Sequence, residues 1–101
     1  MKTFEQIQTE KAERAEKLLE LLPKIAGMPK NEEQMKALAE NLTFLAAKAK
    51  EQKKMCNDQR ATLLDEELAA ILKIGAEPDI APIRSALILI ASRKTSLNML
   101  K

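Results

Sequence analysis

Residues 32–56 have the sequence EEQMKALAENLTFLAAKAKEQKKMC, and the spacing of their apolar side chains decides the fold class. Seven residues, alternately three and four positions apart, form one seam: Met35, Leu38, Leu42, Leu45, Ala49, Gln52 and Cys56. That alternation is the heptad pattern of a coiled-coil-like helix that packs one face against another helix. We therefore predict a helix over 32–56. Its strongest seam residues, which we expect to pack against the first helix or a partner, are Met35, Leu38, Leu42 and Leu45.

The composition of the whole chain favours helices in the same way. Its 101 residues include 15 Leu, 15 Ala and 8 Ile, but no Val, Tyr or Trp, and only 2 Gly and 4 Pro. Ala and Leu are good helix formers, whereas Val and the aromatic residues are preferred in strands. We expect an all-α fold and, at this length, a single domain over residues 1–101.

A first helix is predicted over residues 3–22. Thr3 and Gln6 have the spacing of a capping box, in which each side chain binds a backbone N–H at the start of a helix. Pro23 is expected to stop or kink this helix, because proline lacks the N–H that an inner helical position donates.

Residues 46–62 allow two interpretations. A continuous helix from Glu32 to Ile74 would be roughly 64 Å long at about 1.5 Å per residue. Alternatively, Asn57 and Asp58 are suitable caps for a new helix, and Thr62 followed by Asp65 offers a second start signal. We favour a break or bend, because a pattern much longer than about 25 residues is typical of extended coiled coils.

A helical hairpin is predicted at the C-terminal end, with helices over 62–74 and 80–94. In the helix predicted over 62–74, we expect the acidic residues 65–67 near the start and Gly75 just after the end. Asp79 is the expected N-cap of the helix over 80–94. Residues 80–91 are apolar on nearly every side of a helix, so their burial should need another subunit or a partner as well. A strand over 85–92 is the alternative, but it would have no strand to pair with in this chain.

These elements predict a small three- to four-helix bundle that forms a homo-oligomer, a dimer or a tetramer. The expected association core lies on the C-terminal hairpin, on faces with helical spacing. Its residues are Leu64, Leu68, Ile71, Ile83, Leu87 and Ile90.

The composition also narrows the chemistry. The chain has no His and one Cys, so it lacks the commonest general base and the residues of a Cys-based zinc site. Adjacent acids at 65–67 point about 100° apart on a helix and cannot form a carboxylate dyad. Cys56 falls on the seam, where a small apolar thiol packs well. We expect no enzyme activity, no metal and no cofactor.

Charge provides one alternative function. The formal net charge is only +2, but a basic segment over 48–60 could face nucleic acid, with affinity that falls steeply with salt. Its cations are Lys48, Lys50, Lys53, Lys54 and Arg60. The segment lacks the aromatic residues that stack on single-stranded bases.

The expected location is the cytoplasm. The N-terminal residues are polar rather than a secretory signal, and no stretch approaches the about 20 apolar residues of a membrane span. The function we expect is a non-enzymatic protein–protein interaction module, a regulator of the adaptor, inhibitor, antirepressor or chaperone type. It would act through helix–helix packing with a protein partner and through self-association.

Overall fold

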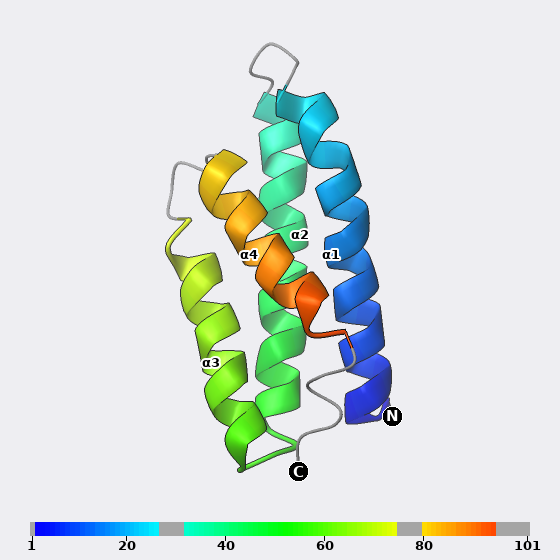
Figure 1. Cartoon of the computed structure of the whole chain (residues 1–101), viewed down its shortest axis with the longest axis vertical. Helices are drawn as coiled ribbons and strands as arrows, with labels where there is room; N and C mark the ends of the chain where they lie inside the picture. Colours follow the sequence, from blue (N-terminus) through cyan, green and yellow to red (C-terminus); the bar gives the residue numbers. More distant parts are fainter. Residues whose placement is uncertain (1, 27–31, 75–79, 95–101) are drawn as a thin grey trace.

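The computed structural model describes residues 2–26, 32–74 and 80–94. Over these ranges it consists of four helices and has no strand, which confirms the all-α bundle. The helices are α1 (Phe4–Ala26), α2 (Glu32–Lys53), α3 (Gln59–Leu72) and α4 (Ile80–Ser92) (Figure 1). The strand considered for 85–92 is therefore excluded, since α4 contains these residues.

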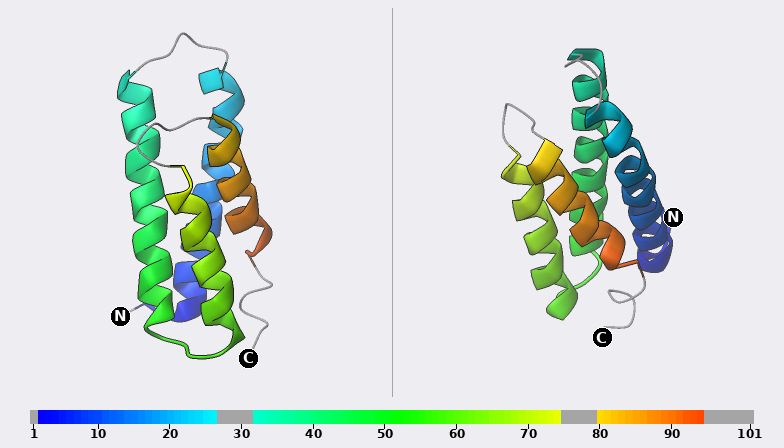
Figure 2. Two further views of the ribbon diagram at one scale, coloured as in Figure 1. Left: turned by 90° about the vertical axis from the view of Figure 1, so that its left-hand side faces the viewer. Right: turned by 45° about the horizontal axis from the view of Figure 1, so that its top comes forward.

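The helices run alternately up and down, and each packs against its neighbours in the sequence. The most extensive interface joins α4 to α1, which closes the ring. Figure 2 shows that α4 crosses the bundle obliquely, from the end of α3 towards the N-terminal half of α1. The molecule measures 44 × 23 × 22 Å, because α1 and α2 are much longer than the other two helices.

The start of α1 is as predicted, but its end is not. The Thr3 N–H donates to Gln6 Oε1 at 2.9 Å and the Gln6 N–H donates to Thr3 Oγ1 at 3.1 Å, which forms the capping box. The helix was predicted to end at residue 22, with Pro23 stopping or kinking it, but α1 continues through Pro23 to Ala26. Proline removes one backbone N–H donor, and Pro23 is exposed and lies three residues before the end of α1, so little helix follows the missing donor.

The break between the second and third helices is confirmed. α2 ends at Lys53, and the Asp58 carboxylate accepts the backbone N–H of Arg60 at 3.0 Å as the N-cap of α3. The alternative start at Thr62 is wrong, because α3 begins at Gln59. The acids at 65–67 consequently lie beyond the first turn.

The main core is formed by one face of each long helix together with α4. It contains three groups of buried side chains and one further residue: Ala15, Leu18 and Leu22; Leu38, Leu42 and Leu45; Ile83, Ala86, Leu87 and Ile90; and Ile74. A smaller cluster near the opposite end is built on Ala49 and Leu64, with Phe4 and Cys56 packed against it. The α2 seam thus packs inside the chain, against residues of α1 and α4.

The predicted caps at Gly75 and Asp79 lie outside the described residues.

Candidate protein-binding groove

An open groove runs between α3 and α4, with a volume of about 630 Å³. Its walls are mostly small or apolar side chains, and one acid and one base stand on the α3 wall. The lining residues are Glu66, Ala69, Ala70 and Lys73 from α3, and Pro82, Ser85, Ala86 and Leu89 from α4. α4 begins near the C-terminal end of α3 and runs away from it at an oblique angle, so the groove lies where the two helices are closest along the chain.

The two charges of the groove differ in their partners. Glu66 Oε2 accepts a hydrogen bond from Arg93 Nη2 at 2.6 Å, which anchors the acid. Lys73 closes α3 with its backbone N–H, which donates to the Ala69 carbonyl at 3.0 Å. Its exposed side chain has no partner among residues 2–26, 32–74 and 80–94. Large apolar residues are also exposed elsewhere on these helices, since Leu72 is 79% exposed and Ile88 52%.

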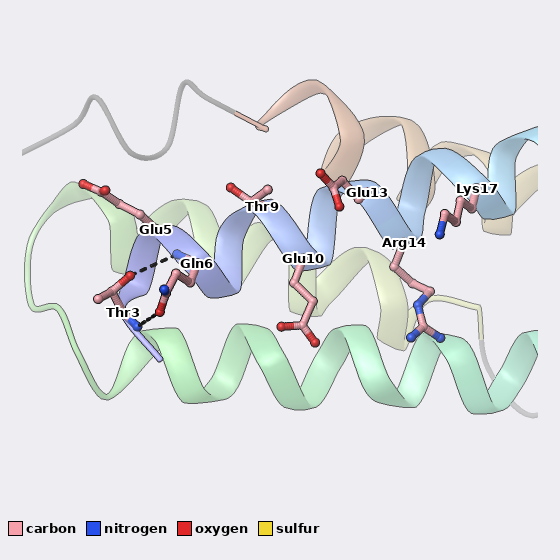
Figure 3. A pocket seen from close by; sticks show the side chains of 8 residues that line it. All are labelled: Thr3, Glu5, Gln6, Thr9, Glu10, Glu13, Arg14 and Lys17. Atoms are coloured by element: carbon pink, nitrogen blue, oxygen red, sulfur yellow. Dashed lines mark hydrogen bonds between the residues drawn. The ribbon is translucent and has the colours of Figure 1, made fainter. Parts of the chain in front are cut away.

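Two other hollows lie on α1. The first is open and polar, with a volume of about 620 Å³. Figure 3 shows its side chains standing on the outer surface of α1, with Glu10 and Arg14 extending towards α2. The Lys2 ammonium donates a hydrogen bond to Glu10 and lowers the pKa of that carboxyl. Arg14 donates to Asn41 at 2.8 Å and stacks over the Phe44 ring, so its charge is held in place.

The second hollow on α1 is smaller and more apolar. It lies between α1 and α2, has a volume of about 300 Å³, and has Leu18, Leu21 and Leu38 among its lining residues.

A buried polar network joins α1, α2 and α3 to Arg93, the residue that follows α4, close to the smaller core cluster. Lys11 Nζ lies 2.9 Å from Glu67 Oε1 and donates to Gln52 Oε1 at 2.7 Å. Gln52 Nε2 in turn donates to Gln8 Oε1 at 2.9 Å, and Gln8 Nε2 donates to the Arg93 carbonyl at 2.6 Å. The side chains of four members are fully buried: Lys11, Glu67, Gln52 and Gln8. Of the three adjacent acids at 65–67, Glu67 is therefore buried in the network, whereas Asp65 and Glu66 are exposed.

The Lys11–Glu67 contact is an ion pair rather than a well-aligned hydrogen bond. Glu67 Oε1 has the Lys11 ammonium beside it but no hydrogen bond of good geometry within the described part of the chain. Burial lowers the pKa of Lys11, because the loss of hydration destabilises the ammonium more than its attraction to the Glu67 carboxylate stabilises it. The Arg93 guanidinium, 3.5 Å from Glu67 Oε2, also lowers the Lys11 pKa by repulsion.

The sequence contains a signal for this network. Gln52 occupies a seam position, where an apolar residue would be expected. Lys11 likewise lies in the buried series of α1, four residues after Ile7 and four before Ala15. A polar residue on an otherwise apolar face indicates a buried partner.

The six residues predicted to form the association core lie within one chain. Leu64, Ile83, Leu87 and Ile90 are buried, while Leu68 and Ile71 are partly buried and pack against the two clusters. The fold of a single chain therefore already explains why these positions are apolar. Their role in self-association stays a prediction.

The predicted nucleic-acid segment is divided between two helix ends. Lys53 forms an ion pair with Asp65, and Lys48 lies 3.7 Å from Glu51. Arg60 is held by Asp58 at 2.9 Å and stacks over the Phe4 ring. The remaining cations of the segment, Lys50 and Lys54, are exposed. Nucleic-acid binding stays a prediction, with these two lysines as its most available charges.

Cys56 is partly buried beside the smaller cluster, as a packing role requires. Its thiol lies 3.5 Å from the Gln52 carbonyl, and burial raises the pKa of the thiol. A raised pKa reduces the thiolate fraction and with it the reactivity.

Among the described residues, no group of three or more His, Cys, Asp or Glu side chains is arranged to hold a metal ion. None of the helices in that part of the chain is both long enough and apolar enough to span a membrane. Comparisons of the chain with protein-family models, curated protein sequences and solved structures found no match.

Proposed function

We propose that this protein is a protein–protein interaction module that receives a helix of its partner in the groove between α3 and α4. The groove itself carries the proposal. Ala69 and Ser85 are exposed and small enough for the backbone of a guest helix to approach closely, and Leu89 offers an apolar contact. Packing a helix into an apolar groove is a common mode of protein recognition.

The charges at the groove are consistent with this role. Interfaces commonly have an apolar centre and a polar rim, and the rim selects the partner and its orientation. Here the centre is apolar, and Glu66 and Lys73 stand on either side of Ala69 and Ala70 along α3.

Site-specific photocrosslinking in cells of the source organism tests the proposal. A benzophenone amino acid is placed at Ser85, inside the groove, and at Ala47, an exposed position on α2, as the control site. We expect an adduct at Ser85 whose cross-linked peptide, identified by mass spectrometry, comes from a helical segment. The adduct should disappear when Ala69→Arg fills the groove.

The matched control is Ala47→Arg, which adds the same charge to another exposed helical alanine. It should leave the adduct unchanged. Equal adducts from both crosslinking sites, or an adduct at Ser85 that survives Ala69→Arg, would overturn the proposal.

A further inference from the structure

We infer that the occupant of the α3–α4 groove is a second copy of this chain, bound with its α3 antiparallel to the first. This inference deepens the function proposed above and rests on it, because it names the partner. It starts from the two charges on the α3 wall. Glu66 and Lys73 are seven residues apart, so they lie on nearly the same side of α3, separated by about 10.5 Å along its axis.

That arrangement is complementary to itself. When two α3 helices run antiparallel about a two-fold axis midway between Ala69 and Ala70, Glu66 of each copy lies opposite Lys73 of the other. Both ion pairs form at once, as an isologous interface requires. A groove with two acids or two bases at these positions would instead repel a second copy in this orientation.

The residues at the axis fit the same geometry. Ala69 of one copy lies opposite Ala70 of the other on both sides of the axis, and neither side chain extends beyond Cβ. The helix axes can therefore approach towards the lower end of the about 8–10 Å range of packed helices. Leu89 and Pro82 on the α4 wall then lie beside the incoming helix and supply apolar contact.

The charges have the freedom that this pairing needs. Lys73 is exposed and lacks a side-chain partner in the described residues, so it can turn to a second copy. Glu66 is held by Arg93 through Oε2, and the side chain is 55% exposed, which leaves its other oxygen available.

Sedimentation or light scattering with refractive-index detection tests the inference, since the chain has no Trp or Tyr. The concentration series should extend to about 1 mM, where dissociation constants in the millimolar range are still detected. We expect the wild-type mass to rise from 11.3 kDa towards twice that value. Lys73→Glu places like charges opposite each other twice in the dimer, and it should weaken association at least about tenfold.

A mixing experiment separates this geometry from other dimers. Glu66→Lys and Lys73→Glu should each weaken self-association, whereas an equimolar mixture of the two variants should form a heterodimer with two ion pairs, one in the wild-type order and one reversed. The double variant Glu66→Lys/Lys73→Glu should likewise regain the wild-type affinity. Because Glu66 also binds Arg93, circular dichroism must first show that each variant is folded, and Lys73→Glu tests the interface without disturbing that contact.

A wild-type protein that stays monomeric overturns the inference, and so does a dimer that Lys73→Glu leaves unchanged. Either result is distinct from failure of the proposed function. A crosslink from Ser85 to a different protein would still support the groove as a helix-binding site, while refuting the second copy as its occupant.

Discussion

The buried ion pair between Lys11 and Glu67 gives the sharpest test of how this bundle is held together. Both side chains are fully buried, and each belongs to a different helix. Removing one member leaves an uncompensated charge in the interior, which typically costs about 3–5 kcal/mol. For a chain of this length the total free energy of unfolding is about 5–15 kcal/mol, so either single substitution should remove a large part of it.

The surroundings of the pair predict that the two single variants differ. In Lys11→Met, the Glu67 carboxylate keeps the Arg93 guanidinium 3.5 Å away. In Glu67→Met, the Lys11 ammonium keeps only the neutral Gln52 oxygen at 2.7 Å. Glu67→Met should therefore be the more destabilising of the two.

The double variant Lys11→Met/Glu67→Met removes both charges and keeps similar volumes. Replacing a buried pair by apolar residues is often neutral or stabilising. Here Gln52 Oε1 also loses its donor, which costs about 1–3 kcal/mol for a buried acceptor. We expect the free energy of unfolding of the double variant to lie within about 2 kcal/mol of the wild-type value. Its loss of stability should therefore be much smaller than the sum of the losses of the two single variants.

Urea unfolding followed by circular dichroism at 222 nm measures all four proteins of this cycle, and the absence of Trp and Tyr does not affect that signal. Single losses below about 1 kcal/mol that add in the double variant would refute the reasoning, because uncoupled residues behave additively. Thr43→Ala, at an exposed position of α2, serves as the control for substitutions in general.

The same cycle has a pH dependence with a definite sign. The pKa of Lys11 in the folded protein lies below its ordinary value of 10.5, so the unfolded chain binds more protons in the interval between the two. The free energy of unfolding should therefore rise as the pH increases from the pKa of the folded state to that of the unfolded chain. This gain in stability is lost when the pH is lowered through the pKa of the folded state. Relative to the double variant, the wild type should become more stable as the pH approaches 10.5. A difference that stays constant up to that pH contradicts the lowered pKa.

Three further predictions concern single residues. Leu87→Ala removes a fully buried side chain from the main core and should cost about 2–5 kcal/mol of the free energy of unfolding, measured with urea, whereas Ile88→Ala at the exposed neighbouring position should cost far less. Hydrogen bonds from Arg60 lower the pKa of Asp58, so the stabilisation by Asp58 is present above its ordinary pKa of 3.8 and is lost as the pH falls below it. Asp58→Asn should therefore flatten that part of the acid unfolding curve. An unchanged curve would contradict the role of Asp58 as a cap. Burial raises the pKa of the Cys56 thiol, so iodoacetamide should alkylate it more slowly at pH 8 in the folded protein than in urea; equal rates would show that the thiol is not shielded.

The helical elements could be predicted because their signals are local. The α2 seam, the capping box at Thr3 and the cap at Asp58 each depend on residues within one or two turns of each other. The predicted end of the first helix at residue 22 was too early, because a proline is tolerated where few helical residues follow it, and α1 continues for only three residues beyond Pro23.

The polar network and the groove could not be predicted in the same way. Lys11 and Glu67 are far apart in the sequence, and nothing local shows that their helices meet. The groove is lined by residues of two helices, and nothing local in the sequence shows how α4 lies against α3. The apolar surplus of residues 80–91 indicated burial correctly for Ile83, Leu87 and Ile90, but it did not indicate which protein surface provides the cover.

Arg93 connects the groove to the interior. Its Nη2 binds Glu66 at the groove, its Nη1 binds the Leu63 carbonyl at 2.7 Å and lies near Glu67, and its own carbonyl accepts the hydrogen bond from Gln8. In the proposed dimer, Lys73 of a second copy would approach a carboxylate whose other partner is the guanidinium that faces the buried ion pair. We therefore expect substitutions that displace Arg93 to change the affinity at the groove, and substitutions in the network that leave Arg93 in place to have little effect on it.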